Sequence, residues 1–339
     1  MERKRNAAWN HHPDLPIPVS PILNWPPRPL AWLKWLSAYW LALSSVTVEL
    51  FLAWAVYQWF QPGWEEMQSL APAWMLQIWL RNFLLLVLVA GGLHLWFITL
   101  KGQGKKLKFD GRDQAADNGH FTFRNQVRDN MFWSIASSLT CWTLYETGYF
   151  WAAANGMVPQ ITLASNPVWF LAWLVIIPVW SSFHFYWAHR LLHWPPMYRL
   201  AHSLHHRNIN IGPWAGISMH PVEAVLYFST LLIHFIVPSH PIHFLFHCYV
   251  NGLNPCVSHS GFEKISVKDR NRFNAGDFFH QLHHRYFECN YGTAEMPWDV
   301  IFGSFHDGSE DATRITRERK KRMHAHGKDR MPAAQDKVS

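Results

Sequence analysis

The chain has 339 residues, of which 49% are hydrophobic and only 16% are charged, well below the roughly 25% of an average soluble protein. Its net charge of +7 is modest and concentrated in particular loops, which favours membrane topology over nucleic acid as its cause. The cysteines form no CxxC pair, so free thiols in a reducing compartment are expected instead of disulfides or a zinc knuckle. These four are Cys141, Cys248, Cys256 and Cys289.

Residues 1–28 form a polar, Pro-rich segment without the apolar core and cleavage site of a signal peptide. Residues 29–187 are predicted to carry the transmembrane helices, because four apolar stretches there approach the roughly 20 residues that a span needs. These stretches are 40–60, which Glu49 interrupts, 82–100, 131–154 and 168–187. The sequence therefore predicts an all-α integral membrane protein with about four transmembrane helices.

The connecting loops orient these spans. Segments 61–73 and 155–167 contain no Lys or Arg, whereas loop 101–130 carries seven. The positive-inside rule places that loop and both termini in the cytoplasm, at the endoplasmic reticulum of a eukaryote or the inner membrane of a bacterium. The fourth span then ends on the cytoplasmic side, where a helical cap is expected.

Two later apolar segments, 222–237 and 241–253, are each too short to cross a membrane. They are interpreted as an interfacial helical pair, with a fifth and sixth crossing as the alternative. Their four histidines are expected to face lipid headgroups: His234, His240, His243 and His247. Residues 308–339 are highly charged and are expected to form a disordered tail.

Histidine motifs dominate the second half of the chain. They are His189-x-x-x-His193, His202-x-x-His205-His206 and His280-x-x-His283-His284. Residues spaced i, i+3 and i+4 share one helix face, and neutral imidazole is a usual ligand of iron, zinc, copper and nickel. Eight histidines exceed the ligands of one four- to six-coordinate metal, so the motifs predict a two-metal centre carried by the cap.

Acidic residues are missing from the first two motifs, since 183–207 contains no Asp or Glu. This pattern excludes the carboxylate-bridged di-iron bundle with its Glu-x-x-His motifs and the HExxH zinc hydrolase. The remaining all-nitrogen ligand set suits oxygen chemistry at iron better than hydrolysis.

The runs 185–190 with His193, 202–206 and 279–284 resemble the fatty acid hydroxylase/sterol desaturase superfamily of integral-membrane di-iron oxygenases. The resemblance covers residues 168–306 and includes the segments 297–299 and 302–305. It implies that the eight motif histidines hold two irons, which activate O2 and attack an unactivated lipid C–H bond. One position departs from the family: Ser182 stands where an acidic residue often precedes the first motif.

Family members also use a histidine between the two HxxHH motifs, and His259 is the match in this chain. The predicted catalytic and metal-ligating residues are therefore His189, His193, His202, His205, His206, His259, His280, His283 and His284. A ligating imidazole usually donates its other N–H to a carboxylate or carbonyl. Asp277, three residues before His280, and His220 are the candidates for supporting the ligands. His184 is expected to pack against neighbours.

The sequence contains no strand-flanked GxGxxG and no cysteine set for an iron–sulfur cluster. An external electron donor is therefore implied, cytochrome b5-like or ferredoxin-like and fed by NAD(P)H. The expected substrate is an apolar lipid, fatty acyl or sterol-like, among the membrane lipids. Hydroxylation is the leading hypothesis. Desaturation of the same substrates is one alternative, and a non-catalytic membrane metal-binding or metal-transport protein is an alternative of another class.

Overall fold

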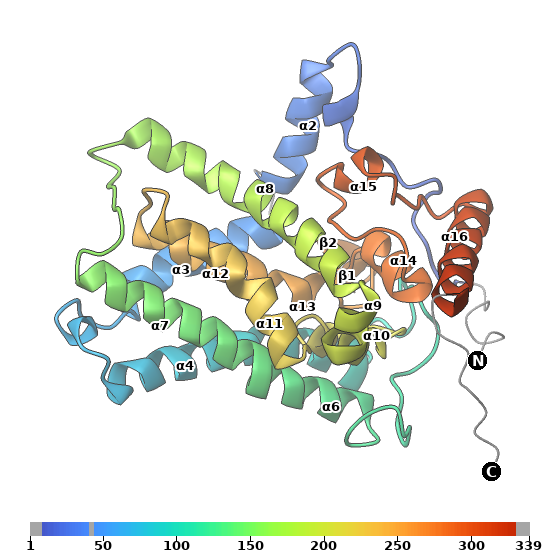
Figure 1. The fold of residues 1–339 in the computed structure, drawn as a ribbon, viewed down its shortest axis with the longest axis horizontal. Helices are drawn as coiled ribbons and strands as arrows, with labels where there is room; N and C mark the ends of the chain where they lie inside the picture. Colours follow the sequence, from blue (N-terminus) through green and yellow to red (C-terminus); the bar gives the residue numbers. More distant parts are fainter. Residues whose placement is uncertain (1–8, 41–43, 330–339) are drawn as a thin grey trace.

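The computed structural model describes residues 9–40 and 44–329. The described part is largely helical, and its longest helices run side by side along the long axis of the molecule (Figure 1). The N-terminal half contains a 3-10 turn Pro21–Leu23, α2 (Pro29–Trp40), α3 (Ser45–Trp59), a 3-10 turn Glu66–Gln68, α4 (Pro72–Leu86), α5 (Gly92–His94), α6 (Gln126–Trp133) and α7 (Thr140–Ala154). Turns of π-helix lie between α4 and α5, after α5, and between α6 and α7, at Val87–Gly91, Leu95–Thr99 and Ser134–Leu139.

The second half begins with α8 (Pro167–Leu192), the longest single element. After it come α9 (Pro195–Met197), a π-helical turn Tyr198–His202, α10 (Ser203–His206), a 3-10 turn Pro213–Ala215, α11 (Pro221–Phe228) with a 3-10 extension Ser229–Phe235, α12 (Pro241–Gly252) and α13 (Asn254–Ser258). A hairpin of β1 (Lys264–Val267) and β2 (Arg270–Asn274) comes next, and then α14 (Phe278–Tyr286), α15 (Trp298–Ile301) and α16 (Glu310–Asp329).

Two helices are long and apolar enough to cross a membrane: Pro72–Thr99, of 28 residues, and Pro167–Leu192, of 26 residues. They correspond to the second and fourth predicted spans. The second begins at Pro72, well before the predicted residue 82, because Arg81 and Asn82 do not end the helix. Both side chains are buried, where Arg81 forms an ion pair with Glu146 and the Asn82 amide donates to the same carboxylate at 2.8 Å.

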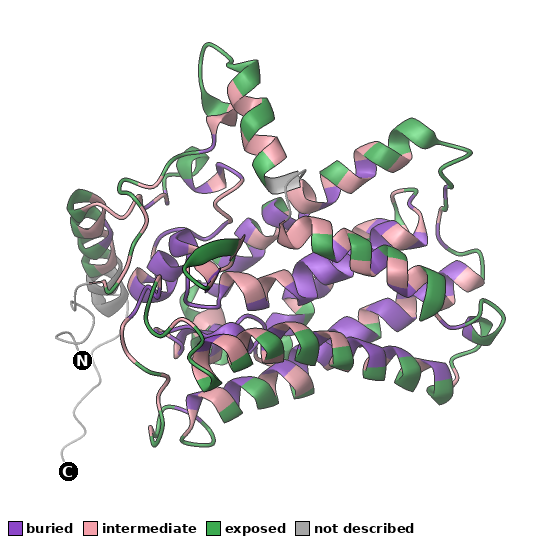
Figure 2. Ribbon diagram, turned by 180° about the vertical axis from the view of Figure 1, so that it is seen from behind, coloured by how far each residue is buried: buried purple, intermediate pink, exposed green. Residues whose placement is uncertain are grey.

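The other two predicted spans also fall on helices. The stretch 40–60 contains α3, which has 15 residues and carries the buried Glu49, while residues 41–43 lie outside the described part. The stretch 131–154 lies in one continuous helical run, 126–154, so the last residues of the predicted loop 101–130 are helical. The outer faces of the long helices expose large apolar side chains such as Phe51, Leu84 and Leu144, whereas buried residues gather on the inner faces (Figure 2).

The interpretation of 241–253 as a surface-lying helix is wrong. Helix α12 is buried along nearly its whole length and packs against α3 and α8. His234, His243 and His247 are fully buried and do not face headgroups, and His234 Nε2 lies 2.9 Å from His247 Nδ1. The polar side chains of α12 are hydrogen-bonded inside the bundle, as Asn251 is to the Ser181 hydroxyl at 3.2 Å, so the helix can be buried on all sides. His240, partly buried, caps α12 by accepting from the Ile242 amide.

The expectation of disorder beyond residue 308 is also wrong for the described part of that segment, because α16 is a helix that lies beside α14 (Figure 1). Thr316 is buried, and the Arg319 guanidinium donates to the carbonyl oxygen of Gly303 at 2.9 Å. These tertiary contacts stabilise a segment whose charge-rich sequence alone suggested solvation. Residues 1–8 and 330–339 of the predicted terminal segments lie outside the described residues.

The short helices α9, α10 and α14 gather at the end of the bundle where α8 ends (Figure 1). The basic loop after residue 100 lies at this same end, because hydrogen bonds tie it to the histidine-bearing segments. The Phe109 amide donates to the Gly261 carbonyl at 2.9 Å, and Arg207 forms an ion pair with Asp129 at 3.1 Å. The fold therefore collects the histidine motifs and most of the basic residues of loop 101–130 at one end of the molecule.

Candidate metal centre

The nine predicted ligand histidines are all buried, and the fold brings them together in two groups. One ligand atom from each member of a group lies within 4.8 Å of those of all other members. The five-histidine group consists of His189, His193, His202, His206 and His283, and the four-histidine group consists of His205, His259, His280 and His284. Each HxxHH motif contributes histidines to both groups, so the two groups share the same short segments of the chain.

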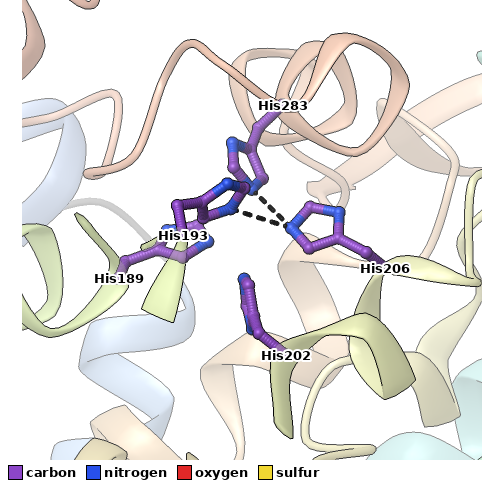
Figure 3. Close-up of side chains that lie close together, drawn as sticks. All are labelled: His189, His193, His202, His206 and His283. Atoms are coloured by element: carbon purple, nitrogen blue, oxygen red, sulfur yellow. Dashed lines mark hydrogen bonds between the residues drawn. The ribbon is translucent and has the colours of Figure 1, made fainter. Parts of the chain in front are cut away.

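The five-histidine group is drawn in Figure 3, where the five rings point toward one another. His189 lies in the last turn of α8, and His193 is the residue that ends that helix. The π-helical turn Tyr198–His202 carries His202, α10 carries His206, and α14 carries His283 across from them. A π-helical turn accommodates an extra residue, and such turns occur frequently at functional sites.

The four-histidine group adjoins it. His205 of α10 and His284 of α14 have ring centroids 4.7 Å apart, and the centroid of His284 is 5.1 Å from that of His206 in the other group. His259 comes directly after α13, and its Nε2 lies 3.0 Å from the Nε2 of His280 and 3.2 Å from that of His284. The two groups therefore form one continuous layer of imidazoles.

The orientation of the rings matches the needs of a metal. The outward Nδ1–H groups of His189 and His283 donate to the carbonyl oxygens of Tyr291 and Cys289 at 2.7 and 2.6 Å. The Nδ1 of His259 likewise donates to the carbonyl of Pro255 at 2.9 Å. A proton on Nδ1 leaves a bare lone pair on Nε2, directed inward.

Inward lone pairs repel one another unless a cation lies between them. Metal–nitrogen bonds of about 2.1 Å place ligand atoms within about 4.2 Å of each other, close to the observed spacing. The Nε2 of His202 is buried and has no hydrogen-bond partner among the described residues. The donor set therefore fits two metal ions, one in each group.

Burial also keeps the imidazoles uncharged. It lowers the pKa of His202 to about 3 and that of His205 to about 4, although Glu223 partly offsets the effect on His205. The pKa values of His206, His280 and His283 lie well below the usual range for the same reason, with further lowering by neighbouring histidines. Neutral imidazole is the form that binds metal, so the ligands are ready near pH 7.

The two residues predicted to support the ligands, Asp277 and His220, cap helices instead. Asp277 caps α14 through its side chain, which accepts from the Phe279 amide at 2.9 Å. Burial raises its pKa to about 7, and no hydrogen bond to an imidazole is seen among the described residues. His220 caps α11 by accepting from the Val222 amide at 3.2 Å. His184, expected to pack, is partly buried and contacts the Ser229 hydroxyl.

Glu223 is the supporting residue that sequence reasoning missed. Its Oε1 lies 2.8 Å from the Nδ1 of His202, and both side chains are 2% exposed. Burial raises the pKa of Glu223 to about 7. The signal in the sequence was its place three residues after His220 at the start of an apolar helix, where a buried carboxylate needs a partner. That partner, His202, is 21 residues away and could not be identified from spacing.

A cavity of about 630 Å³ opens onto the histidines. His189 and His202 of the five-histidine group line it, and so do His205, His259 and His280 of the other group. Its remaining walls are largely apolar and come mostly from α2, α3, α8, α11, α12, α13, the start of α14 and the segment before α15, while the start of the hairpin adds the charged side chains of Glu263 and Lys264. The apolar walls include Trp35, Pro178, Phe185, Tyr227, Val250 and Met296. The volume lies in the roughly 300–1,000 Å³ range of small-molecule sites.

Comparison with known proteins agrees with this geometry. The family model described as fatty acid hydroxylase matches residues 173–304, which contain all nine histidines. No solved structure matches the chain.

Curated relatives carry sterol desaturase names. The chain is 32% identical over 162 residues to the Delta(7)-sterol 5(6)-desaturase ERG3B of Gibberella zeae, a match that covers 44% of this chain and 49% of the relative. It is 35% identical over 122 residues to the corresponding Saccharomyces cerevisiae ERG3 protein, covering 35% of this chain and 32% of the relative. These matches span half or less of the relatives' length.

A longer match joins the chain to the Delta(7)-sterol-C5(6)-desaturase of Nicotiana tabacum, with 26% identity over 245 residues, 70% of this chain and 86% of the relative. The histidine motifs, the family-model match and these relatives agree. Residues 173–304 therefore match the fatty acid hydroxylase family, in agreement with the superfamily that the motifs predicted.

Proposed function

We propose that this protein is a membrane-bound di-iron oxygenase that oxidises an unactivated C–H bond of a lipid. The observation that carries the proposal is the convergence of nine buried histidines in two adjoining groups beside an apolar cavity. A neutral, all-nitrogen ligand set suits redox-active iron. Two bound iron ions would supply the activation of O2, with two electrons per turnover from outside the chain.

The nine histidines are proposed as the metal ligands, one ion to each group. Three members of the four-histidine group, His205, His259 and His280, line the cavity. A lipid that fills the cavity would therefore lie directly beside this group. The chain's own part in the reaction is to hold the lipid in a water-poor pocket and to fix five of the nine imidazoles through Nδ1 hydrogen bonds. These five are His189, His202, His205, His259 and His283.

The proposed substrate is an apolar lipid, fatty acyl or sterol-like. The cavity walls are mostly hydrocarbon and aromatic, and Phe185 stacks on His189 with ring centroids 4.9 Å apart. The names of the relatives make a Delta(7)-sterol the first candidate to test. A sterol ring system is rigid, so binding it would cost little conformational entropy.

Hydroxylation and desaturation begin with the same hydrogen abstraction and share the cofactor and the electron supply. Hydroxylation places one oxygen atom of O2 in the product and adds 16 Da. Desaturation removes two hydrogens, lowers the mass by 2 Da and releases both oxygen atoms as water. Hydroxylation is the leading prediction from the motifs, and the names of the relatives favour desaturation, so product analysis discriminates between them.

The proposed topology has four spans, formed by α3, Pro72–Thr99, the helical run 126–154 and α8. The metal centre and both termini would lie in the cytoplasm, with residues 168–306 as the catalytic region. The exposed apolar faces of the long helices support burial in lipid. The placement of the basic loop at the histidine-bearing end supports the sidedness, because Lys and Arg concentrate on the cytoplasmic side.

Electrons are proposed to come from a cytochrome b5-like or ferredoxin-like carrier fed by NAD(P)H. Exposed cations on the basic loop, Lys101, Lys105 and Lys106, lie at the end of the molecule that holds the histidines. They would attract an acidic carrier, and this attraction would weaken with increasing salt.

The test uses full-length protein loaded with iron in lipid nanodiscs, supplied with a reductant system and ¹⁸O2. A Delta(7)-sterol and a fatty acyl lipid are the substrates, and a His284→Ala variant is the matched control. The proposal expects a product 2 Da lighter without ¹⁸O, or one carrying a single ¹⁸O, from the wild type alone. Metal uptake into proteoliposomes, with no O2 consumed and no lipid changed, would instead favour a metal transporter.

A further inference from the structure

Glu223 makes a contact that no other described carboxylate makes with the nine histidines. Its Oε1 lies 2.8 Å from the Nδ1 of His202, within hydrogen-bond distance. Glu288 is the nearest competitor, but its Oε1 is 3.9 Å from the Nδ1 of His193 and its Oε2 accepts from the Tyr291 hydroxyl at 2.6 Å. Glu223 is therefore the one carboxylate in the described chain hydrogen-bonded to a candidate ligand.

The two histidine groups differ in this respect. In the four-histidine group, the Nδ1 atoms of His205 and His259 face the neutral carbonyl oxygens of Ser218 and Pro255, at 3.3 and 2.9 Å. In the five-histidine group, two Nδ1 atoms face carbonyls and His202 faces the Glu223 carboxylate. A carboxylate on the outer nitrogen raises the basicity of the inner nitrogen and fixes its direction.

The second carboxylate oxygen is also informative. Glu223 Oε2 is buried and has no hydrogen-bond partner among the described residues, and the Glu223 side chain lines the cavity. A buried carboxylate left without a cation is costly, since nine neutral imidazoles offer it little compensation. A metal ion held by His202 would provide the missing positive charge. Loading of the five-histidine group would therefore stabilise the Glu223 carboxylate.

We propose that Glu223 is the positioning residue of the five-histidine group, which it makes the tighter of the two metal sites. It holds the His202 ring with Nε2 directed inward and supplies the negative charge that the rest of the group lacks. The inference rests on the proposed function only in requiring that both groups bind metal. The new element is that the five-histidine group binds metal more tightly than the four-histidine group.

The test is a titration of metal-free, detergent-purified full-length protein with Co²⁺, whose visible absorption reports its ligand geometry. Three variants separate the roles of Glu223. Glu223→Ala removes both the acceptor and the charge, and Glu223→Gln keeps an acceptor oxygen without the charge. Glu295→Ala is the matched control, because Glu295 lines the same cavity and no hydrogen bond from it to a histidine is seen among the described residues.

The wild type should bind two Co²⁺ ions in two resolved steps. Glu223→Ala should weaken the tighter step by about 10- to 100-fold, the range found for partners of metal ligands. Glu223→Gln should recover part of that loss and most of the wild-type spectrum, while Glu295→Ala should titrate like the wild type. Recovery by Gln separates positioning from a folding defect.

Two double variants show which of the two groups is affected by the loss of Glu223. With the four-histidine group disabled by His284→Ala, adding Glu223→Ala should weaken the remaining site by the same factor. With the five-histidine group disabled by His283→Ala, it should change the remaining site little. Equal weakening in both backgrounds, or an unchanged titration, would overturn the inference. A wild type that binds fewer than two ions would refute the proposed function instead.

Discussion

The Nδ1–H of His189 donates to the carbonyl oxygen of Tyr291 at 2.7 Å, joining two residues that are 102 positions apart. The segment around Tyr291 has no regular secondary structure, and the buried Asp299 holds it in place. Asp299 accepts from the backbone amides of Tyr291 and Gly292 at 2.8 and 2.7 Å. The position of a candidate ligand on α8 is thus controlled by a carboxylate on α15.

The first prediction concerns this support. Asp299→Asn turns an amide NH2 toward one of the two backbone donors, so one hydrogen bond is lost and a buried donor remains unsatisfied, at a cost of about 1–3 kcal/mol. Metal affinity should fall about 10-fold or more, because the carbonyl that orients His189 shifts. Metal content and the thermal unfolding midpoint measure both effects.

The control for that variant is Asp307→Asn, since Asp307 accepts from the Ser309 amide at 2.9 Å outside both histidine groups. It should keep the wild-type metal content. Equal metal content in the two variants would show that the Tyr291 segment does not position His189.

A second prediction concerns Gly216, which packs directly against α13. A Cβ atom at this position would lie 2.3 Å from the carbonyl oxygen of Pro255, the same oxygen that accepts from His259 Nδ1. Gly216→Ala should therefore displace His259 and lower metal binding in the four-histidine group about 10-fold or more. Gly148→Ala, where a Cβ meets nothing within 4 Å, should leave metal binding unchanged. Co²⁺ titration of the two variants checks this, and full binding by Gly216→Ala would contradict it.

The third prediction separates the cavity from the metal centre. Val250 lines the cavity, so Val250→Phe should fill part of it while leaving every histidine in place. Lipid oxidation should fall about 10-fold or more, because a misplaced substrate loses its alignment with the reacting groups, while two metal ions per chain are retained. Val225→Phe, on an exposed position of α11, should have wild-type activity. Undiminished turnover in Val250→Phe would mean that the substrate binds elsewhere.

The fourth prediction is a pH dependence of the metal-free protein. The pKa of His202 falls to about 3 and that of His205 to about 4 in the folded state, against about 6.5 when unfolded. The unfolded chain then binds more protons below about pH 6.5, so folding stability is full above that pH and decreases as pH falls toward the folded values. Each group contributes about 1.4 kcal/mol per pH unit inside this window.

Thermal unfolding of metal-free protein at about pH 7.5, 6.5 and 5.5 measures this dependence. The midpoint temperature should decrease when the pH is lowered from about 6.5 to about 5.5. The midpoint of a His202→Gln variant should decrease less over the same change in pH. A His202→Gln variant whose midpoint falls as steeply as that of the wild type would show that His202 does not carry this dependence.

The sequence predicted the candidate metal centre better than the surrounding fold. Ligand spacing is a local property, so the sequence alone was enough to assign His202, His205 and His206 to one helical segment. Their division between two groups could not be predicted, because it depends on how α10 meets α14. The partner of His202 was missed for the same reason, since Glu223 reaches it from a different helix.

The wrong predictions about the fold have one physical cause: polar side chains are paired with residues that are distant in the sequence. Arg81 appeared to end an apolar stretch, yet Glu146 neutralises it inside the bundle. His247 appeared suited to a surface, yet His234 satisfies its ring in the interior. Arg319 appeared solvated, yet it holds α16 against the Gly303 carbonyl. Pairings of this kind carry no signal in local composition.

The most direct test of the proposed di-iron centre is iron K-edge X-ray absorption on purified, iron-loaded protein. Two histidine groups that each bind one ion should give about two irons per chain, with a first shell made mostly of nitrogen and the outer-shell scattering of four to five imidazoles for each metal ion. One iron per chain or fewer in folded protein that has been saturated with iron, or a first shell dominated by oxygen or sulfur, would contradict it.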